Sequence, residues 1–574
     1  MNSGWKRGIT GLLSIGALGL MLTGCGTSTG NNGGTGEAST ITDNEKPQMG
    51  GNLTLDLSQA VPDVDPAIGY DTTSSEILYQ LYEPLVTYKK NTYQIVGDLA
   101  KSYDVSADGL TYTFHLRQGV KFWNNDPMTS KDFVFELERI LNPNMKPNPS
   151  PGSSFFMDIA GAQAYYNGQT KTISGVSTPN DSTLVIKLVK PESFFLQVLA
   201  LPFLSAVDPK FVNKVGNAAF NTTEAMGTGP FELVTNNQSQ VVLKRNPNYW
   251  QKDQYGNQLP YLNQITFNVN SNTQLDEMHW EQGQTGFLSP WVTGGNGIPT
   301  SSYPSIMGNP QYSKLVQKQA ENSVAYVGLN VSKTLDGKAN PLSNIDVRKA
   351  IEYAFNDQQI VKLNNGAVLP LNQPLPSGMP GYVQHLNSDA TYTFNLTKAK
   401  QLLKQAGYTH GLTLTLWDQN TPDARKMDQA FQSMMQQIGI TVKINEVSWS
   451  DFLAKEMSGD AQMFWGGWSQ DFPDPSDFLN TLFNSNQRPQ NNNTMYDNAQ
   501  VDAWLNEAEY MTNQSQRNAL YGKVTNQVMA DATWVPVYQF TGYYAVQSWV
   551  HGFYTSPVLF DPFQYIWIDQ NHSS

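Results

Sequence analysis

Apolar and polar residues alternate along several short stretches of the first 320 residues, a pattern typical of half-buried β-strands. Two segments in this part have apolar residues at helical spacing, and Thr129 or Ser130 stands where the cap of the second helix is expected. The strands are predicted at residues 51–61, 110–122, 182–190, 241–245 and 265–270, and the helices at 75–85 and 129–141. This part of the chain is therefore predicted to be a strand-rich, mixed α+β region.

Helices and strands are predicted to alternate more regularly from residue 346 onward. The helices are predicted at residues 346–355, 396–406, 423–439 and 450–459, and the strands at 412–417, 440–449 and 461–468. Thr397 is expected to cap the second of these helices. The alternation predicts a parallel sheet covered by helices. Ligands of such sheets bind just beyond the carboxyl ends of the strands.

The last predicted strand runs into FWGGWSQDFPDPSDF at residues 464–478, which combines aromatic residues, carboxylates and turn residues. Asp474 precedes a proline and is typical of a turn, and Asp477 is expected to cap the helix that follows. Asp471 has no such local role, and the glycine pair before it allows another chain to approach the backbone. Asp471 is therefore the carboxylate of this stretch with the strongest reason to contact a ligand.

Neither a metal site nor an enzyme motif is evident in the chain. Asp471, Asp474 and Asp477 are three residues apart, whereas a calcium loop places its oxygen ligands at alternate positions. No two of the six histidines lie within four residues of each other, and no nucleophile elbow, phosphate-binding loop or zinc-protease motif is present. A carboxylate pair for glycoside cleavage remains open, because any two of the 49 acidic residues could converge. We expect no metal, no cofactor and no catalytic activity.

Composition and length add three points. The chain has 13 Trp, 27 Tyr and 26 Phe but only 15% charged residues, which suits an aromatic-lined binding site or, equally, large aromatic cores. Its formal net charge of −13 argues against nucleic acid as a partner. A length of 574 residues predicts two or three domains.

The N-terminus has the pattern of a secretory signal. Lys6 and Arg7 precede a short apolar run at residues 9–23, which is too short to span a membrane. The run ends in Leu22-Thr23-Gly24-Cys25, which resembles the bacterial lipobox, and Cys25 is the only cysteine. An ordinary secretory signal or a buried thiol are the alternatives to lipid attachment.

Lipid attachment at Cys25 would place the mature protein on the outer face of the cytoplasmic membrane, with two acyl chains as the physically sufficient anchor. Residues 1–24 are then a lipoprotein signal peptide, whose removal takes the formal net charge from −13 to −15. Residues 25–50, rich in Gly, Ser, Thr and Asn, are predicted to be a flexible tether.

A resemblance to a known family rests on a series of motifs that occur in the same order as in that family. The chain resembles the family 5 extracellular solute-binding proteins of ABC importers, in particular the oligopeptide- and dipeptide-binding group. The motifs are LAKSYDVSADGLTYTFHLRQGVKFWNNDPMTSKDFVFELERIL (99–141), GTGPFEL (227–233), RNPNYW (245–250), VGLNVSK, DVRKAIEYAFN (346–356), AKQLLKQAGY (399–408), GGWSQDFPDPSDFLNTLF (466–483) and WVPVYQF (534–540).

The resemblance implies a bilobed, periplasmic-binding-protein-like α/β fold with three domains and a hinge. Domain I would comprise residues 51–96, 229–324 and 541–574, domain II residues 97–228, and domain III, the second lobe, residues 325–540. It implies a monomer that captures extracellular oligopeptides between its lobes and delivers them to the permease subunits of an ABC transporter. A peptide would pair its backbone with strand edges, which are indifferent to ligand sequence.

The same resemblance supplies candidate ligand residues. In peptide-binding relatives, an aspartate at the position of Asp471 holds the α-ammonium of the peptide. Trp468, Gly467, Trp465, Tyr70 and Tyr538 would line the site. One branch carries an arginine for the peptide carboxylate where this chain has Trp465, which leaves recognition of the far end of the ligand open. Because two tryptophans suit stacking on sugars, an oligosaccharide binder is the alternative, and an extracellular enzyme a remote one.

Overall fold

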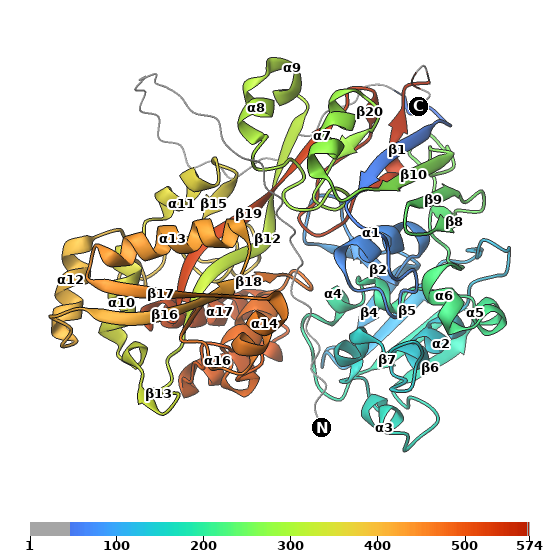
Figure 1. The fold of residues 1–574 in the computed structure, drawn as a ribbon. Coiled ribbons are helices and arrows are strands. Elements are labelled where there is room, and N and C mark those ends of the chain that lie inside the picture. Colours follow the sequence, from blue (N-terminus) through green and yellow to red (C-terminus); the bar gives the residue numbers. More distant parts are fainter. Residues whose placement is uncertain (1–45, 571, 573–574) are drawn as a thin grey trace.

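The computed structural model describes residues 46–570 and 572. The predicted signal peptide, Cys25 and most of the predicted tether lie outside the described residues. The described chain forms two lobes that lie side by side (Figure 1). The first contains the N-terminal half and the last residues of the chain, and the second contains the segment between them.

The first lobe is built on two four-stranded sheets. One has the order β1-β10-β9-β8, in which β1 and β10 are parallel, and the other is antiparallel with the order β4-β5-β7-β6. The strands are β1 (Asn52–Leu57), β4 (Ala100–Val105), β5 (Thr111–Leu116), β6 (Val176–Asn180), β7 (Thr183–Lys187), β8 (Phe231–Asn236), β9 (Gln240–Arg245) and β10 (Gln264–Val269). Both sheets bury one face in a common hydrophobic core with α1 (Thr72–Leu81) and α2 (Ser130–Ile140).

The second lobe is built on a sheet with the order β11-β19-β12-β18-β16-β17, and β15 also pairs with β19. The strands are β11 (Phe287–Leu288), β12 (Val316–Leu329), β15 (Val368–Pro370), β16 (Leu412–Gln419), β17 (Ile440–Val447), β18 (Met463–Ser469) and β19 (Trp534–Val546). The prediction of a parallel sheet is right only for β16, β17 and β18, because β12 pairs antiparallel to both β18 and β19. Alternation reports on consecutive elements, whereas β12 and β19 join the sheet from distant parts of the chain.

Helices cover both faces of this sheet. One face packs against α10 (Ile345–Ala354), α12 (Leu396–Gln405) and α13 (Pro422–Gln436). The other packs against α15 (Pro475–Phe483), α16 (Ala499–Glu509) and α17 (Gln514–Ala530). α14 (Trp449–Met457) connects β17 to β18.

Two long strands, β12 and β19, run from one lobe into the other (Figure 1). The first residues of β12 pair with the end of β19, Val316 with Ala545, next to β11. The last residues of β12 pair with the start of β19 and with β18. The register shifts between Ala320 and Val324, so that the ladder is interrupted where the strands pass between the lobes.

The structure confirms one of the predicted helix caps and corrects another. The Asp132 carboxylate accepts a hydrogen bond from the Thr129 backbone at 2.6 Å, which confirms the predicted start of α2. Asn395, not Thr397, caps α12, because that helix begins at Leu396, two residues earlier than a Thr397 cap would place it. An Asn amide oxygen makes the same N-cap bond as a hydroxyl.

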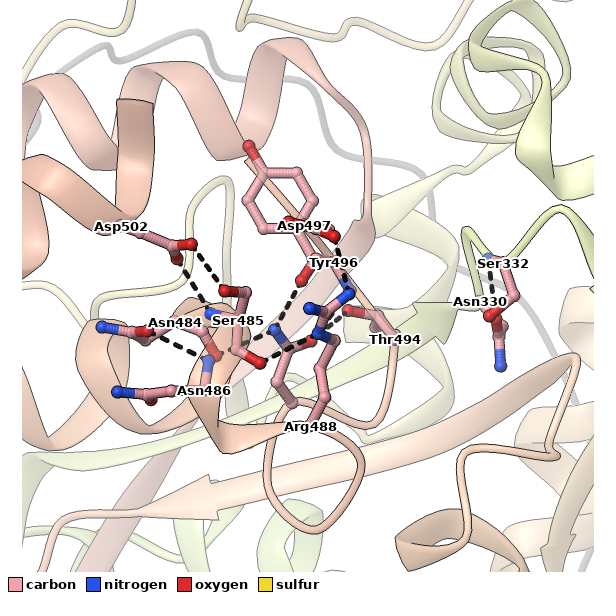
Figure 2. A network of polar contacts seen from close by, with 11 residues as sticks. Asn330, Ser332, Asn484, Ser485, Asn486, Arg488, Thr494, Tyr496, Asp497 and Asp502 are labelled. Atoms are coloured by element: carbon pink, nitrogen blue, oxygen red, sulfur yellow. Dashed lines mark hydrogen bonds and ion pairs between the residues drawn. The ribbon is translucent and has the colours of Figure 1, made fainter. Parts of the chain in front are cut away.

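An Asn-rich loop in the second lobe is held by side-chain-to-backbone hydrogen bonds (Figure 2). Asp502 accepts from the backbone N–H of Ser485 at 2.8 Å and from its hydroxyl at 2.6 Å. Arg488 donates to the Ser485 carbonyl at 2.9 Å and pairs with Asp497 at 2.9 Å. Together with the short 3-10 helix Ser485–Gln487, these bonds order the loop after α15 and satisfy polar groups that an irregular segment would otherwise leave unpaired.

Candidate functional site

The two tryptophans of β18 point to opposite faces of the sheet. Trp465 packs on the face covered by α13, where its ring lies edge-on to that of Phe431 with the ring centroids 6.2 Å apart. Trp468 packs on the face covered by α15. A spacing of three residues produces this result because side chains of a strand alternate between faces. The two rings therefore do not form one stacking surface.

The carboxylates after β18 have separate structural partners. Asp474 caps α15 through the Ser476 backbone at 2.9 Å and forms a two-pronged ion pair with Arg517 at 2.5 and 2.6 Å. Asp477 accepts from the Trp468 indole at 3.2 Å and from the Asp471 backbone N–H at 2.9 Å. The expectation that Asp477 caps the helix is therefore wrong. α15 starts at Pro475, which puts Asp474 in the cap position and frees Asp477 to fix the preceding turn.

Asp471 lies at the carboxyl end of β18 and contacts the other lobe. Its carboxylate accepts a hydrogen bond from the hydroxyl of Tyr70, which precedes α1 in the first lobe. Burial first, and then the neighbouring Asp471 carboxylate, raise the pKa of Tyr70 well above its ordinary value. The hydroxyl thus stays protonated and donates to the carboxylate. The structure brings together these two residues, which are 401 positions apart in the chain.

Phe472, next to Asp471, inserts into an aromatic cluster of the first lobe. Its ring stacks on Phe194 at 4.9 Å and lies edge-on to Phe155 at 6.3 Å. Phe203 packs against Phe155 at 5.9 Å and against Tyr70 at 5.5 Å. Sequence reasoning missed this cluster. The signal that the sequence offered was two pairs of adjacent phenylalanines, Phe155-Phe156 and Phe194-Phe195. In the structure the second ring of each pair is buried, and the first is only partly buried.

A polar contact flanks this aromatic cluster. Lys190 of the first lobe lies 3.5 Å from the Glu509 carboxylate of the second, and the Ser193 hydroxyl donates to the Glu509 carbonyl at 3.2 Å. The ion pair is only partly buried, because 37% of the Lys190 side chain is exposed. The lobes thus meet through Asp471, Phe472 and Glu509.

The remaining candidates, Gly467 and Tyr538, lie on neighbouring strands. Gly467 is exposed and pairs with Ala325 of β12, which in turn pairs with Tyr538 of β19. Tyr538 packs on the same face as Trp465. Gly466 has a different role, because a Cβ there would meet the Tyr326 ring at 2.4 Å. Gly466 therefore makes room for the Tyr326 ring, whereas Gly467 leaves its backbone exposed.

Two buried carboxyl groups, those of Asp428 and Asp418, lie in the region of Trp465. Burial raises the pKa of Asp428 on α13 to about 7, opposed by the Trp465 indole. Burial and then Asp428 raise the pKa of Asp418 on β16 to about 8. A position that would bind a ligand carboxylate needs a cation. Arg425 of α13 also acts on Asp428, but its guanidinium is paired with Glu446 at 2.6 Å.

Within the described part of the chain, no cluster of three or more His, Cys, Asp and Glu side chains is arranged to hold a metal ion. No described helix is both long enough and apolar enough to cross a membrane.

Comparison with known proteins identifies relatives along most of the chain. A model of the family described as "Bacterial extracellular solute-binding proteins, family 5 Middle" matches residues 94–490. Heme-binding protein A of Haemophilus influenzae is 28% identical over 578 residues, covering 97% of this chain and 98% of that protein. Oligopeptide-binding protein OppA of Bacillus subtilis is 28% identical over 540 residues, covering 91% of this chain and 92% of that protein.

A solved structure has the same fold. The periplasmic binding protein DppA from Helicobacter pylori, in complex with the peptide STSA, superimposes with a TM-score of 0.71 at 26% identity and covers 91% of this chain and 99% of that one. The predicted mixed α/β, periplasmic-binding-protein-like fold is confirmed. The predicted family is confirmed as well.

Proposed function

Because the chain belongs to the family 5 bacterial extracellular solute-binding proteins, we propose that it captures oligopeptides between its two lobes and passes them to the permease subunits of an ABC importer. It acts as a monomer, without a cofactor and without catalysis. Peptide-binding proteins among its relatives support this ligand class. The division into domain I (51–96, 229–324, 541–574), domain II (97–228) and domain III (325–540) is part of the proposal.

The contact between Asp471 and Tyr70 carries the proposal. It brings a carboxylate from the end of β18 against the other lobe, where a ligand enclosed by both lobes would meet it. The two oxygens of a carboxylate have about four lone-pair sites, so it can accept from an α-ammonium as well as from a tyrosine hydroxyl, and bonds to a charged group contribute about 1.5–3 kcal/mol. Gly467 offers an exposed backbone two residues before the end of the same strand.

The arrangement favours peptide over oligosaccharide. Trp465 and Trp468 lie on opposite faces of the sheet, and the Trp468 indole is committed to Asp477. Two rings so placed cannot stack on one sugar chain. An anchored ammonium and an exposed strand backbone suit a peptide instead.

A binding experiment tests the ligand class and the absence of turnover. We expect trialanine to give a calorimetric signal, to be recovered intact by mass spectrometry, and to reduce the radius of gyration in X-ray scattering, because hinge closure brings the lobes together. Maltotriose and hemin are the matched comparison ligands, hemin because one relative is named a heme-binding protein. Binding of maltotriose or hemin alone, or cleavage of the peptide, would contradict the proposal.

Lipid anchoring at Cys25 is a separate part of the proposal and is tested separately. It rests on the Leu22-Thr23-Gly24-Cys25 motif and on the absence of any other cysteine. We expect Cys25→Ser to move the protein from the membrane fraction to the soluble fraction, since the variant lacks the thiol that carries the acyl chains. The mass of the wild-type N-terminal peptide should include the lipid. A Ser variant that stays with the membrane, together with an unmodified wild-type cysteine, would refute the anchor.

A further inference from the structure

A cavity of about 690 Å³ lies in the first lobe, away from Asp471. It is lined by the hairpin of β2 (Val86–Tyr88) and β3 (Ile95–Gly97), by residues 249–255, and by residues 552–567 of the C-terminal segment. No residue of the segment 325–540 lines it. The volume lies within the usual range for a small-molecule site.

Aromatic side chains dominate the walls of this cavity. They make up 12 of the 31 lining residues, against 11% of the whole chain, so the enrichment is more than threefold. Two buried polar atoms in the wall have no hydrogen-bond partner among the described residues, the hydroxyl of Tyr88 and the amide oxygen of Gln80. Both residues are more than nine-tenths buried, at 6% and 1% exposure. Buried polar atoms normally have a hydrogen-bond partner, which a ligand or an ordered water in the cavity would supply.

Two of the three acidic side chains of the wall, those of Glu83 and Asp561, already accept hydrogen bonds. Each carboxylate oxygen of Glu83 accepts a hydrogen bond, from Thr228 at 2.9 Å and from the Trp250 indole at 2.8 Å. Asp561 accepts from the Ser289 hydroxyl at 2.5 Å. Burial raises the pKa of Asp561 and of Asp98 to about 7, which reduces their negative charge near neutral pH.

Two cations of the wall, Lys90 and Arg117, lie against the faces of aromatic rings. The Lys90 ammonium lies 4.1 Å from the ring centroid of Tyr554, and the Arg117 guanidinium lies 4.1 Å from that of Trp250. Neither makes an ion pair within 4 Å among the described residues, although Arg117 donates to the Asp98 carbonyl at 2.6 Å and its charge opposes the rise in the pKa of the Asp98 carboxyl. Ring faces hold both cations, so an anion can approach them without breaking a salt bridge.

We propose that this cavity is a second ligand site, independent of Asp471, for a small organic acid that carries an aromatic ring. The carboxylate pairs with Lys90 and Arg117, the ring packs among the aromatic side chains, and the Tyr88 hydroxyl donates to the ligand. No residue of the segment 325–540 lines this site, although Asp474 of that segment is among the groups that raise the pKa of Tyr88.

Calorimetry with indole-3-acetate tests the site. Tryptamine has the same ring with an ammonium, and acetate has the carboxylate without the ring. We expect indole-3-acetate to bind at least about tenfold more tightly than either, because both the ring and the negative charge contribute. The exposed Lys90→Met should weaken indole-3-acetate binding about tenfold, while the matched exposed variant Lys101→Met, outside the cavity wall, leaves it unchanged.

The outcomes separate this site from that of Asp471. Unchanged affinity for trialanine in Lys90→Met, and unchanged affinity for indole-3-acetate at saturating trialanine, support two independent sites. The proposal is overturned if indole-3-acetate gives no heat at millimolar concentration, if tryptamine binds as well, if Lys90→Met behaves like Lys101→Met, or if trialanine displaces the indole.

Discussion

Replacing Asp471 by Asn is expected to weaken binding of a peptide with a free N-terminus by about a hundredfold or more. The substitution keeps the shape of the side chain but leaves a desolvated ammonium without its counter-charge. Breaking a buried charge pair costs about 3–5 kcal/mol, and each 1.4 kcal/mol is about tenfold in affinity. The backbone N–H of residue 471 still donates to Asp477, so the turn is retained.

A four-way calorimetric cycle isolates this contact. N-acetylation of the peptide removes the ammonium and should cost the wild-type protein a similar amount. The two changes together should cost little more than one, because they remove the same pair. Asp460→Asn, at an exposed carboxylate before β18, is the matched control and should bind normally. Equal binding of acetylated and free peptides would show that Asp471 is not the amine anchor.

The largest expected effect on stability comes from Arg517 of α17. Its side chain is fully buried and pairs with Asp474, donates to the Ala508 carbonyl at 3.0 Å and lies 3.0 Å from the Tyr521 hydroxyl. Arg517→Met leaves the Asp474 carboxylate buried without a cation. We expect the free energy of unfolding in urea to fall by about 3–5 kcal/mol.

Two further variants show that this loss is due to the buried pair. Arg517→Met combined with Asp474→Asn should recover part of the stability, because no unpaired charge remains and an Asn still caps α15. Lys131→Met breaks the pair with Asp181, whose side chains are 70% and 72% exposed, and should cost less than about 1 kcal/mol. Equal losses for Arg517→Met and Lys131→Met would contradict the argument.

The helices and strands predicted from local patterns are present, but the patterns missed the long strands β12 and β19 and the helices α16 and α17. The predicted strand at residues 461–468 is β18, shifted by one or two residues, and the predicted helix at 129–141 is α2 with its expected start. The position of Asp471 just beyond a strand also follows from the sequence, because periodicity locates the end of the strand. The opposite orientation of Trp465 and Trp468 could have been predicted from their spacing alone.

The choice between Asp474 and Asp477 as the cap of α15 depended on where the helix starts. Both are Asp residues near a proline, and local preference does not distinguish them. In the structure the Asp474 carboxylate is buried and paired with Arg517, 43 residues later in the chain. The sequence therefore predicted that a cap exists but not which residue forms it.

By itself, the sequence determined the succession of helices and strands at residues 396–469, the family motifs and the place of Asp471 at a strand end. Tertiary structure alone decided that Asp471 meets Tyr70, that Phe472 packs on Phe194, and that the first lobe encloses an aromatic cavity. Periodicity reports only on neighbours within a few residues along the chain. Contacts between residues hundreds of positions apart depend on how both lobes pack, which no local pattern contains.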